Sequence, residues 1–272
     1  MKKIKLLLVV MVAMCWNANV FAVSFTEKSG TNLPNMGKGA SAVGDINNDG
    51  NLDIVMTGLT TGATVANTYV YFGVGDGTFT ESTFNNSTTG ILPKFEFPAM
   101  ALGDYDKDGD LDLLVNGYVR ANSLSTTKLY TNSGSPNFQF TENTSASSTF
   151  AQVNNGNCKF LDYNNDGWLD VFVSGRNDNT AGGAGGTVAK AGTLYKNNGN
   201  GTFTQNPAGI TSTIQTAASI TDYDNDGDID VVQFGYPGTN SQFAKNNADG
   251  TFTNVGTNGL SNKNNMIIRC IT

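Results

Sequence analysis

One nine-residue pattern occurs four times in this chain, and it restricts the possible folds more than any other feature. Its copies begin at Asp45, Asp104, Asp162 and Asp222, so successive copies lie 59, 58 and 60 residues apart. All four read D-x-[DN]-x-D-G-x-[LI]-D. Self-similarity at a fixed period is typical of an array built from one supersecondary unit. The chain is therefore expected to be a repeat protein.

The residues on either side of each copy predict two strands. Before each copy, residues at the fourth and second positions back follow a period of two, which indicates a strand with one buried face. These pairs are Ser41 and Val43, Met100 and Leu102, Cys158 and Phe160, and Ala218 and Ile220. After each copy comes a short apolar run closed by glycine, which is typical of a buried strand and a turn. These glycines are Gly58, Gly117, Gly175 and Gly235.

Two further strands follow in every copy. The pairs Asp76-Gly77, Asn200-Gly201 and Asp249-Gly250 supply the positive φ that tight hairpins require. Four-stranded repeats of this size stack radially as blades, because each sheet buries both faces only against its neighbours. The predicted fold class is therefore all-β, a β-propeller of four-stranded antiparallel blades.

The loops at 45–53, 104–112, 162–170 and 222–230 carry the ligands that calcium prefers. Ca²⁺ takes about six to eight oxygens, and side-chain oxygens at alternate positions of a loop can surround it. Sixteen of the 23 acidic residues lie in these loops, and such crowding of like charge is costly without a cation. The predicted side-chain ligands, at positions 1, 3, 5 and 9, are Asp45, Asn47, Asp49, Asp53, Asp104, Asp106, Asp108, Asp112, Asp162, Asn164, Asp166, Asp170, Asp222, Asp224, Asp226 and Asp230. Position 7 is predicted to supply a backbone carbonyl, from Asn51, Asp110, Trp168 and Asp228.

Ordinary turns and EF-hands explain these loops less well. Asp, Asn and Gly favour turns by themselves, but turn chemistry does not require carboxylates at the same alternate positions in four copies. An EF-hand needs a bidentate Glu at position 12, where this chain has Met56, Val115, Val173 and Gln233. We therefore expect about four calcium ions, one for each repeat, with a structural role.

The segments AVGDINNDGNLDIV and ALGDYDKDGDLDLL resemble the FG-GAP or VCBS repeats of integrin-α-like β-propellers. The resemblance covers residues 24–255. It implies that each calcium loop joins the first two strands of a blade on one face of the disc, and that partners bind at the other face. The third and fourth copies have Leu161 and Thr221 where the motif has Gly, at positions that are not metal ligands.

Both ends of the chain differ from the repeats. Residues 1–22 combine lysines, a short apolar run and a terminal Ala, which is typical of a signal peptide and predicts a secreted or cell-surface protein. No other apolar segment predicts a transmembrane span. Residues 23–255 hold the repeats, and residues 256–272 are expected to be an incomplete repeat or an irregular tail. We interpret the repeats as part of a longer, seven-bladed array.

Composition argues against catalysis and against nucleic-acid binding. The chain has no His and carries a net charge of −7. Ser-His-Asp arrangements are therefore impossible, and a nucleic acid would be repelled. The four Glu residues, Glu27, Glu81, Glu96 and Glu142, are isolated in the sequence. Asp178 is expected to be a solvated turn residue.

Two functions stay open at this point. The first is a secreted or surface adhesion module that binds a glycan or a protein, and the second is the non-catalytic substrate-binding portion of a polysaccharide-degrading enzyme. Aromatic and arginine side chains in the loops opposite the calcium face are the candidate ligand contacts, and covering of the blade edges is the favoured alternative for each of Phe95, Phe97 and Tyr236. They lie in residues 95–97, 118–120 and 176–190 and at Tyr236.

Overall fold

The computed structural model describes residues 29–60, 62, 66–83, 92–179, 189–206, 210, 217–234 and 242–256. The chain divides into two units, residues 1–31 and residues 32–272. The predicted signal peptide, Tyr236 and nearly all of the predicted tail lie outside the described residues. Everything below concerns the second unit.

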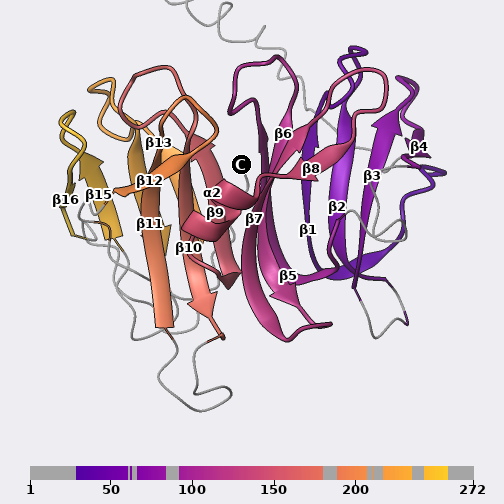
Figure 1. Cartoon of the computed structure of the whole chain (residues 1–272), viewed down its shortest axis with the longest axis horizontal. Helices are drawn as coiled ribbons and strands as arrows, with labels where there is room; N and C mark the ends of the chain where they lie inside the picture. Colours follow the sequence, from indigo (N-terminus) through magenta and orange to yellow (C-terminus); the bar gives the residue numbers. More distant parts are fainter. Residues whose placement is uncertain are drawn as a thin grey trace, which may run out of the picture. The chain divides into compact units, whose positions relative to one another are not determined.

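Four four-stranded antiparallel sheets make up this unit, each formed by strands that are consecutive in the chain (Figure 1). Sheet 1 contains β1 (Met36–Gly44), β2 (Asp53–Thr60), β3 (Ala66–Gly73) and β4 (Phe79–Glu81). Sheet 2 contains β5 (Phe95–Gly103), β6 (Asp112–Val119), β7 (Leu124–Asn132) and β8 (Phe140–Glu142). Sheet 3 contains β9 (Asn154–Leu161), β10 (Asp170–Asn177), β11 (Ala189–Asn197) and β12 (Phe203–Asn206). Sheet 4 contains β13 (Ala217–Thr221), β14 (Asp230–Phe234), β15 (Gln242–Asn246) and β16 (Phe252–Asn254).

This arrangement confirms the predicted all-β fold of four-stranded antiparallel units. Each nine-residue loop joins the first and second strands of its sheet, as the period-two flanks predicted. The one helix in the described residues is α2 (Thr144–Thr149), between β8 and β9. Asn143 caps it by accepting the N–H of Ala146 at 3.0 Å. No helix of the described residues is long and apolar enough to cross a membrane.

The hydrophobic core lies between neighbouring sheets. Val55 of β2 and Leu113 of β6 belong to a cluster shared by sheets 1 and 2. Leu114 and Val171 belong to one shared by sheets 2 and 3, and a third cluster joins sheets 3 and 4. Successive residues of one strand, such as Leu113 and Leu114, therefore enter different clusters, since their side chains point to opposite faces of the sheet. This is how a sheet buries both faces against its neighbours.

One burial prediction is wrong in sheet 1. Met100, Cys158 and Ala218 are buried as expected, and each packs toward the preceding sheet. The equivalent Ser41 is exposed, and the side chain of Val43 is 56% exposed. Within the described residues no sheet precedes sheet 1, so this face of β1 lacks the neighbouring sheet that covers the first strands of sheets 2, 3 and 4.

Candidate functional site

The first aspartate of each loop shapes the turn. One carboxylate oxygen of Asp45 accepts the N–H of Asp49 at 3.0 Å, and the other accepts the N–H of Gly50 at 2.8 Å. The same pair of bonds recurs in the other loops at Asp104, Asp162 and Asp222. Position 1 therefore closes the loop by satisfying backbone donors that face its interior.

Positions 4 and 6 adopt the left-handed backbone conformation. Gly50 has φ 88° and Asn48 has φ 54°. Position 6 is Gly in every loop because only glycine adopts this conformation without steric cost. Position 4 is Asn in three loops, the residue type that tolerates it next best, and Lys107 in the second, with φ 63°.

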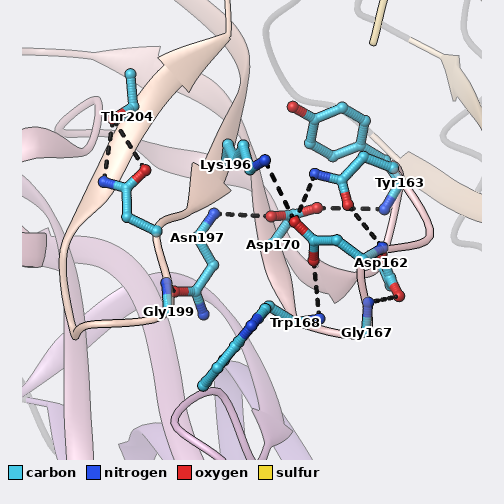
Figure 2. A network of polar contacts seen from close by, with 12 residues as sticks. Asp162, Tyr163, Gly167, Trp168, Asp170, Lys196, Asn197, Gly199 and Thr204 are labelled. Atoms are coloured by element: carbon cyan, nitrogen blue, oxygen red, sulfur yellow. Dashed lines mark hydrogen bonds and ion pairs between the residues drawn. The ribbon is translucent and has the colours of Figure 1, made fainter. Parts of the chain in front are cut away.

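Carboxylates at positions 1, 3 and 5 converge. In the second loop the oxygens of Asp104, Asp106 and Asp108 lie within 4.8 Å of one another, and in the fourth loop those of Asp222, Asp224 and Asp226 do the same. The first and third loops have an amide at position 3. Asn47 and Asn164 donate to the position 5 carboxylate at 3.1 and 3.0 Å. Figure 2 shows the third loop, where Asp162 and Asp170 lie around the same turn.

The second loop contains a carboxylate that lacks a partner. Asp106 Oδ1 is buried and accepts no hydrogen bond, although a buried polar atom is normally paired. Desolvation raises the pKa of Asp106, and the neighbouring charges of Asp108 and Asp104 raise it further. A hard divalent cation is the group that would satisfy this set of oxygens. The oxygen ligands of this loop therefore fit the calcium ion that the sequence pattern predicts.

The aspartate at position 9 fastens three segments together, which sequence reasoning did not predict. Asp53 is fully buried. Its Oδ2 accepts the N–H of Ile46 at 2.8 Å, and its Oδ1 accepts the N–H of Gly73, at the end of β3, at 2.8 Å. The equivalent residues make the same two contacts: Asp112, Asp170 and Asp230. Their predicted role as calcium ligands stays a prediction beside this fastening role.

Burial of the position 9 carboxylates makes their charged form costly. It raises the pKa of Asp112 to about 8 and that of Asp170 to about 7, against the opposing effect of the backbone hydrogen bonds. The pKa values of Asp53 and Asp230 are raised for the same reason. A nearby cation would favour the ionised form of all four.

Lysines from the third strands reach two of the loops. Lys245 of β15 forms ion pairs with Asp224 and, at 2.8 Å, with Asp226. Lys196, at the same place in β11, lies 3.3 Å from Asp166 in the third loop (Figure 2). Phe72 and Thr131 occupy this place in sheets 1 and 2. The third and fourth loops therefore have an internal positive charge beside position 5.

Asparagines at the ends of the third strands tie each sheet to the one before it. Asn132 Nδ2 donates to the carbonyl of Ile46 at 3.0 Å. Asn197 donates to Tyr105, and Asn246 to Tyr163, at 2.8 and 2.7 Å. Each acceptor is position 2 of the preceding sheet's acidic loop. The Asn that recurs at the end of the third strand is visible in the sequence. Its hydrogen-bond partner is not, because that depends on which sheets pack together.

At position 7 the backbone N–H donates to the position 5 carboxylate. Asn51 and Asp49 show this bond at 2.8 Å. The equivalent donors are Asp110, Trp168 and Asp228. Their carbonyls stay the predicted seventh-position ligands.

Some of the predicted ligand contacts lie at the opposite ends of sheets 2 and 3, whereas residues 180–188 and Tyr236 lie outside the described residues. Phe97, Tyr118 and Arg176 line one cavity there. Phe95 is buried in the core between sheets 1 and 2, which agrees with the alternative that it covers a blade. Asp178 is not a solvated turn residue, because it forms an ion pair with Arg176 and accepts a 2.8 Å hydrogen bond from Asn154.

The four sheets and their acidic loops define a propeller-type repeat protein. The FG-GAP-like repeat model matches residues 45–115 and 162–232, and each match begins at the first residue of an acidic loop. The chain belongs to the FG-GAP-like repeat family, and its four sheets are propeller blades. Members of this family often bind calcium and are typical of extracellular proteins. A comparison with curated proteins found no match.

Proposed function

We propose that this chain is a secreted or cell-surface, calcium-stabilised module that binds a glycan or protein ligand and catalyses no reaction. The observation that carries the proposal is the second loop. There three converging carboxylates include a buried oxygen with no partner among the described residues. Repetition of the same backbone bonds in all four loops supports one calcium ion for each repeat.

A structural role for the ions follows from where the loops lie. Each loop joins the first two strands of a sheet and is bonded, through position 9, to the third. Its position 2 carbonyl accepts the asparagine of the next sheet in three of the four cases. An ion that orders the loop therefore also stabilises the contact between neighbouring sheets.

The absence of catalysis is supported by the state of the acidic residues. The chain has no His to act as a base. Glu96 is paired with Arg120, and Glu142 with Lys128 at 2.6 Å. The pairing with Arg120 also lowers the pKa of Glu96, so this buried acid stays ionised and is a poor proton donor. Adhesion through a bound ligand fits this chemistry.

Secretion is supported by the signal-peptide pattern of residues 1–22 and by the extracellular distribution of the family. Expression with and without residues 1–22, followed by fractionation, tests this part. Export that persists without residues 1–22 contradicts it.

Equilibrium dialysis and a binding screen test the rest. The chain should retain about four calcium ions at millimolar concentration, and the loaded form should bind a glycan or a protein without releasing a product. If cleaved saccharide is released when a partner chain is present, the alternative is favoured, in which this chain is the substrate-binding portion of a polysaccharide-degrading enzyme.

A further inference from the structure

A cavity of about 480 Å³ opens between sheets 2 and 3, at the ends of the strands that lie away from the acidic loops. Its lining includes Phe97 of β5, Tyr118 of β6, Asn155 of β9 and Arg176 of β10. The volume falls in the range of about 300–1,000 Å³ that is usual for small-molecule sites. Two sheets therefore build one site of ligand size.

The backbone places two of these side chains at a conformational cost. Phe97 has φ 51° and Asn155 has φ 50°, and both lie in irregular parts of their first strands. A bulky residue with positive φ is a genuine outlier, since glycine adopts this conformation without penalty. Lys38, at the same place in β1, has φ 48°, so this bulge recurs in the first strands of sheets 1, 2 and 3. A bulge redirects a side chain, and in sheet 2 it places Phe97 in the lining of the cavity. Phe97 is 39% exposed, so burial in the core does not explain its position.

Polar groups of the lining are held in fixed positions. The Asn154 side chain is almost fully buried and donates to Ser125 Oγ at 2.6 Å and to Asp178 Oδ2 at 2.8 Å. The other oxygen of Asp178 pairs with Nε of Arg176. This leaves the terminal N–H groups of the guanidinium and the remaining lone pairs of the carboxylate for a ligand.

The charges that line the cavity cancel. Arg176 and Asp178 are its charged lining residues, and they neutralise each other. Outside the lining, Lys38 lies over the Phe97 ring, with Nζ 5.2 Å from the centroid. Paired charges, side-chain amides and two aromatic rings suit a ligand with many hydroxyl groups and no net charge. A lone ion would find no uncompensated opposite charge in the lining.

We infer that this cavity binds a neutral saccharide. A sugar ring packs on Phe97 or Tyr118, and its hydroxyls bond to Asn155, Arg176 and Asp178. The inference rests on the proposed ligand-binding function, for which it names the ligand class and the site. The bulge of β5 then presents the Phe97 ring to the ligand.

Substitution of Phe97 by glycine separates binding from stability. Phe97→Gly removes the ring but relieves the positive φ, so the melting temperature should not fall while saccharide affinity falls by about tenfold or more. Phe138→Gly is the matched control, because Phe138 also has a left-handed φ, 48°, and lies in the β7–β8 turn away from the cavity. It should bind saccharide like the parent chain.

The measurement is calorimetric titration of the calcium-saturated full chain with neutral and anionic oligosaccharides, chosen after a glycan array. Loss of neutral saccharide binding in Phe97→Gly but not in Phe138→Gly supports the inference. Unchanged affinity in Phe97→Gly, or preference for anionic sugars, overturns it and leaves the proposed function standing. If the parent chain binds a protein but no saccharide, the inference fails and the proposed function stands. If it binds neither a saccharide nor a protein, the proposed function fails as well.

Discussion

The side-chain amide of Asn48 donates a 2.7 Å hydrogen bond to the carboxylate of Asp110, which belongs to the acidic loop of the next sheet. Position 4 of one loop thus contacts position 7 of the following loop. Lys107 makes the equivalent contact as a cation–π interaction, with Nζ 4.2 Å from the Trp168 ring centroid, and Asn165 donates to Asp228 at 2.9 Å. The position 7 side chains of the second, third and fourth loops, Asp110, Trp168 and Asp228, therefore each have a partner in the preceding loop.

Removal of this contact should destabilise the chain slightly. Asn48→Gly keeps the left-handed backbone and deletes the amide, so the free energy of unfolding should fall by about 1 kcal/mol. Asn225→Gly is the matched control, since Asn225 occupies position 4 of the last loop with φ 61° and has no side-chain partner among the described residues. Urea unfolding of both variants checks this. Equal effects would show that the contact between loops contributes nothing.

Lys245 should act as an internal substitute for part of the cation's charge. Without calcium, Lys245→Met should lower the melting temperature, because Asp224 and Asp226 lose their counter-charge. With calcium, the same variant should bind the ion more tightly at the fourth loop. Lys196→Met should show a smaller change, since Lys196 has one contact at 3.3 Å. Calcium titration calorimetry measures the calcium affinity of both variants. An unchanged affinity in Lys245→Met would contradict the prediction that Lys245 replaces part of the cation's charge.

Substitutions at positions 3 and 9 should have opposite effects in the absence of metal. Asp53→Asn leaves a single carbonyl oxygen to accept the backbone donors that the carboxylate satisfies, so the free energy of unfolding should fall by about 1–3 kcal/mol even in EGTA. Asp106→Asn should be neutral or stabilising in EGTA, because it removes a like charge from a crowded site. It should weaken calcium binding at the second loop. If the free energy of unfolding in EGTA falls as much in Asp106→Asn as in Asp53→Asn, this division of roles is refuted.

The metal-free chain should become less stable as the pH rises. Burial raises the pKa of Asp112 to about 8 and that of Asp170 to about 7, whereas an unfolded Asp titrates near about 3.9. Between these values the folded chain binds more protons than the unfolded one. The stability that these two groups contribute is therefore fully present below about pH 4. It is lost as the pH rises to about 7–8. In EGTA the melting temperature should fall from pH 5.5 to pH 8, and millimolar calcium should reduce that fall.

Local features of this protein were predictable from its sequence. The four Asp-rich copies predicted the loops, the alternation in their flanks predicted the first two strands, and pairs such as Asp76-Gly77 predicted the hairpins. Each of these features depends on residues that are neighbours in the chain. The left-handed Gly50 and the convergence of Asp104, Asp106 and Asp108 follow from the same local pattern.

Contacts between sheets were not predictable in this way. The bonds from Asn132 to Ile46 and from Asn48 to Asp110 join residues 86 and 62 positions apart, and they exist only because the two sheets are neighbours. The exposure of Val43 has the same origin, since its strand lacks a preceding sheet in the described residues. Pro98 within β5 signals an irregularity of the strand, but it does not predict the left-handed conformation of Phe97.

Scanning calorimetry of the full chain in EGTA and in calcium tests most directly whether the acidic loops are cation sites that hold the blades together. At a free calcium concentration about ten times Kd, each site should contribute ~1.4 kcal/mol and four independent sites ~6 kcal/mol, comparable to the stability of a whole domain. The melting temperature should therefore rise markedly with calcium. An identical melting temperature in EGTA and in calcium would contradict the account.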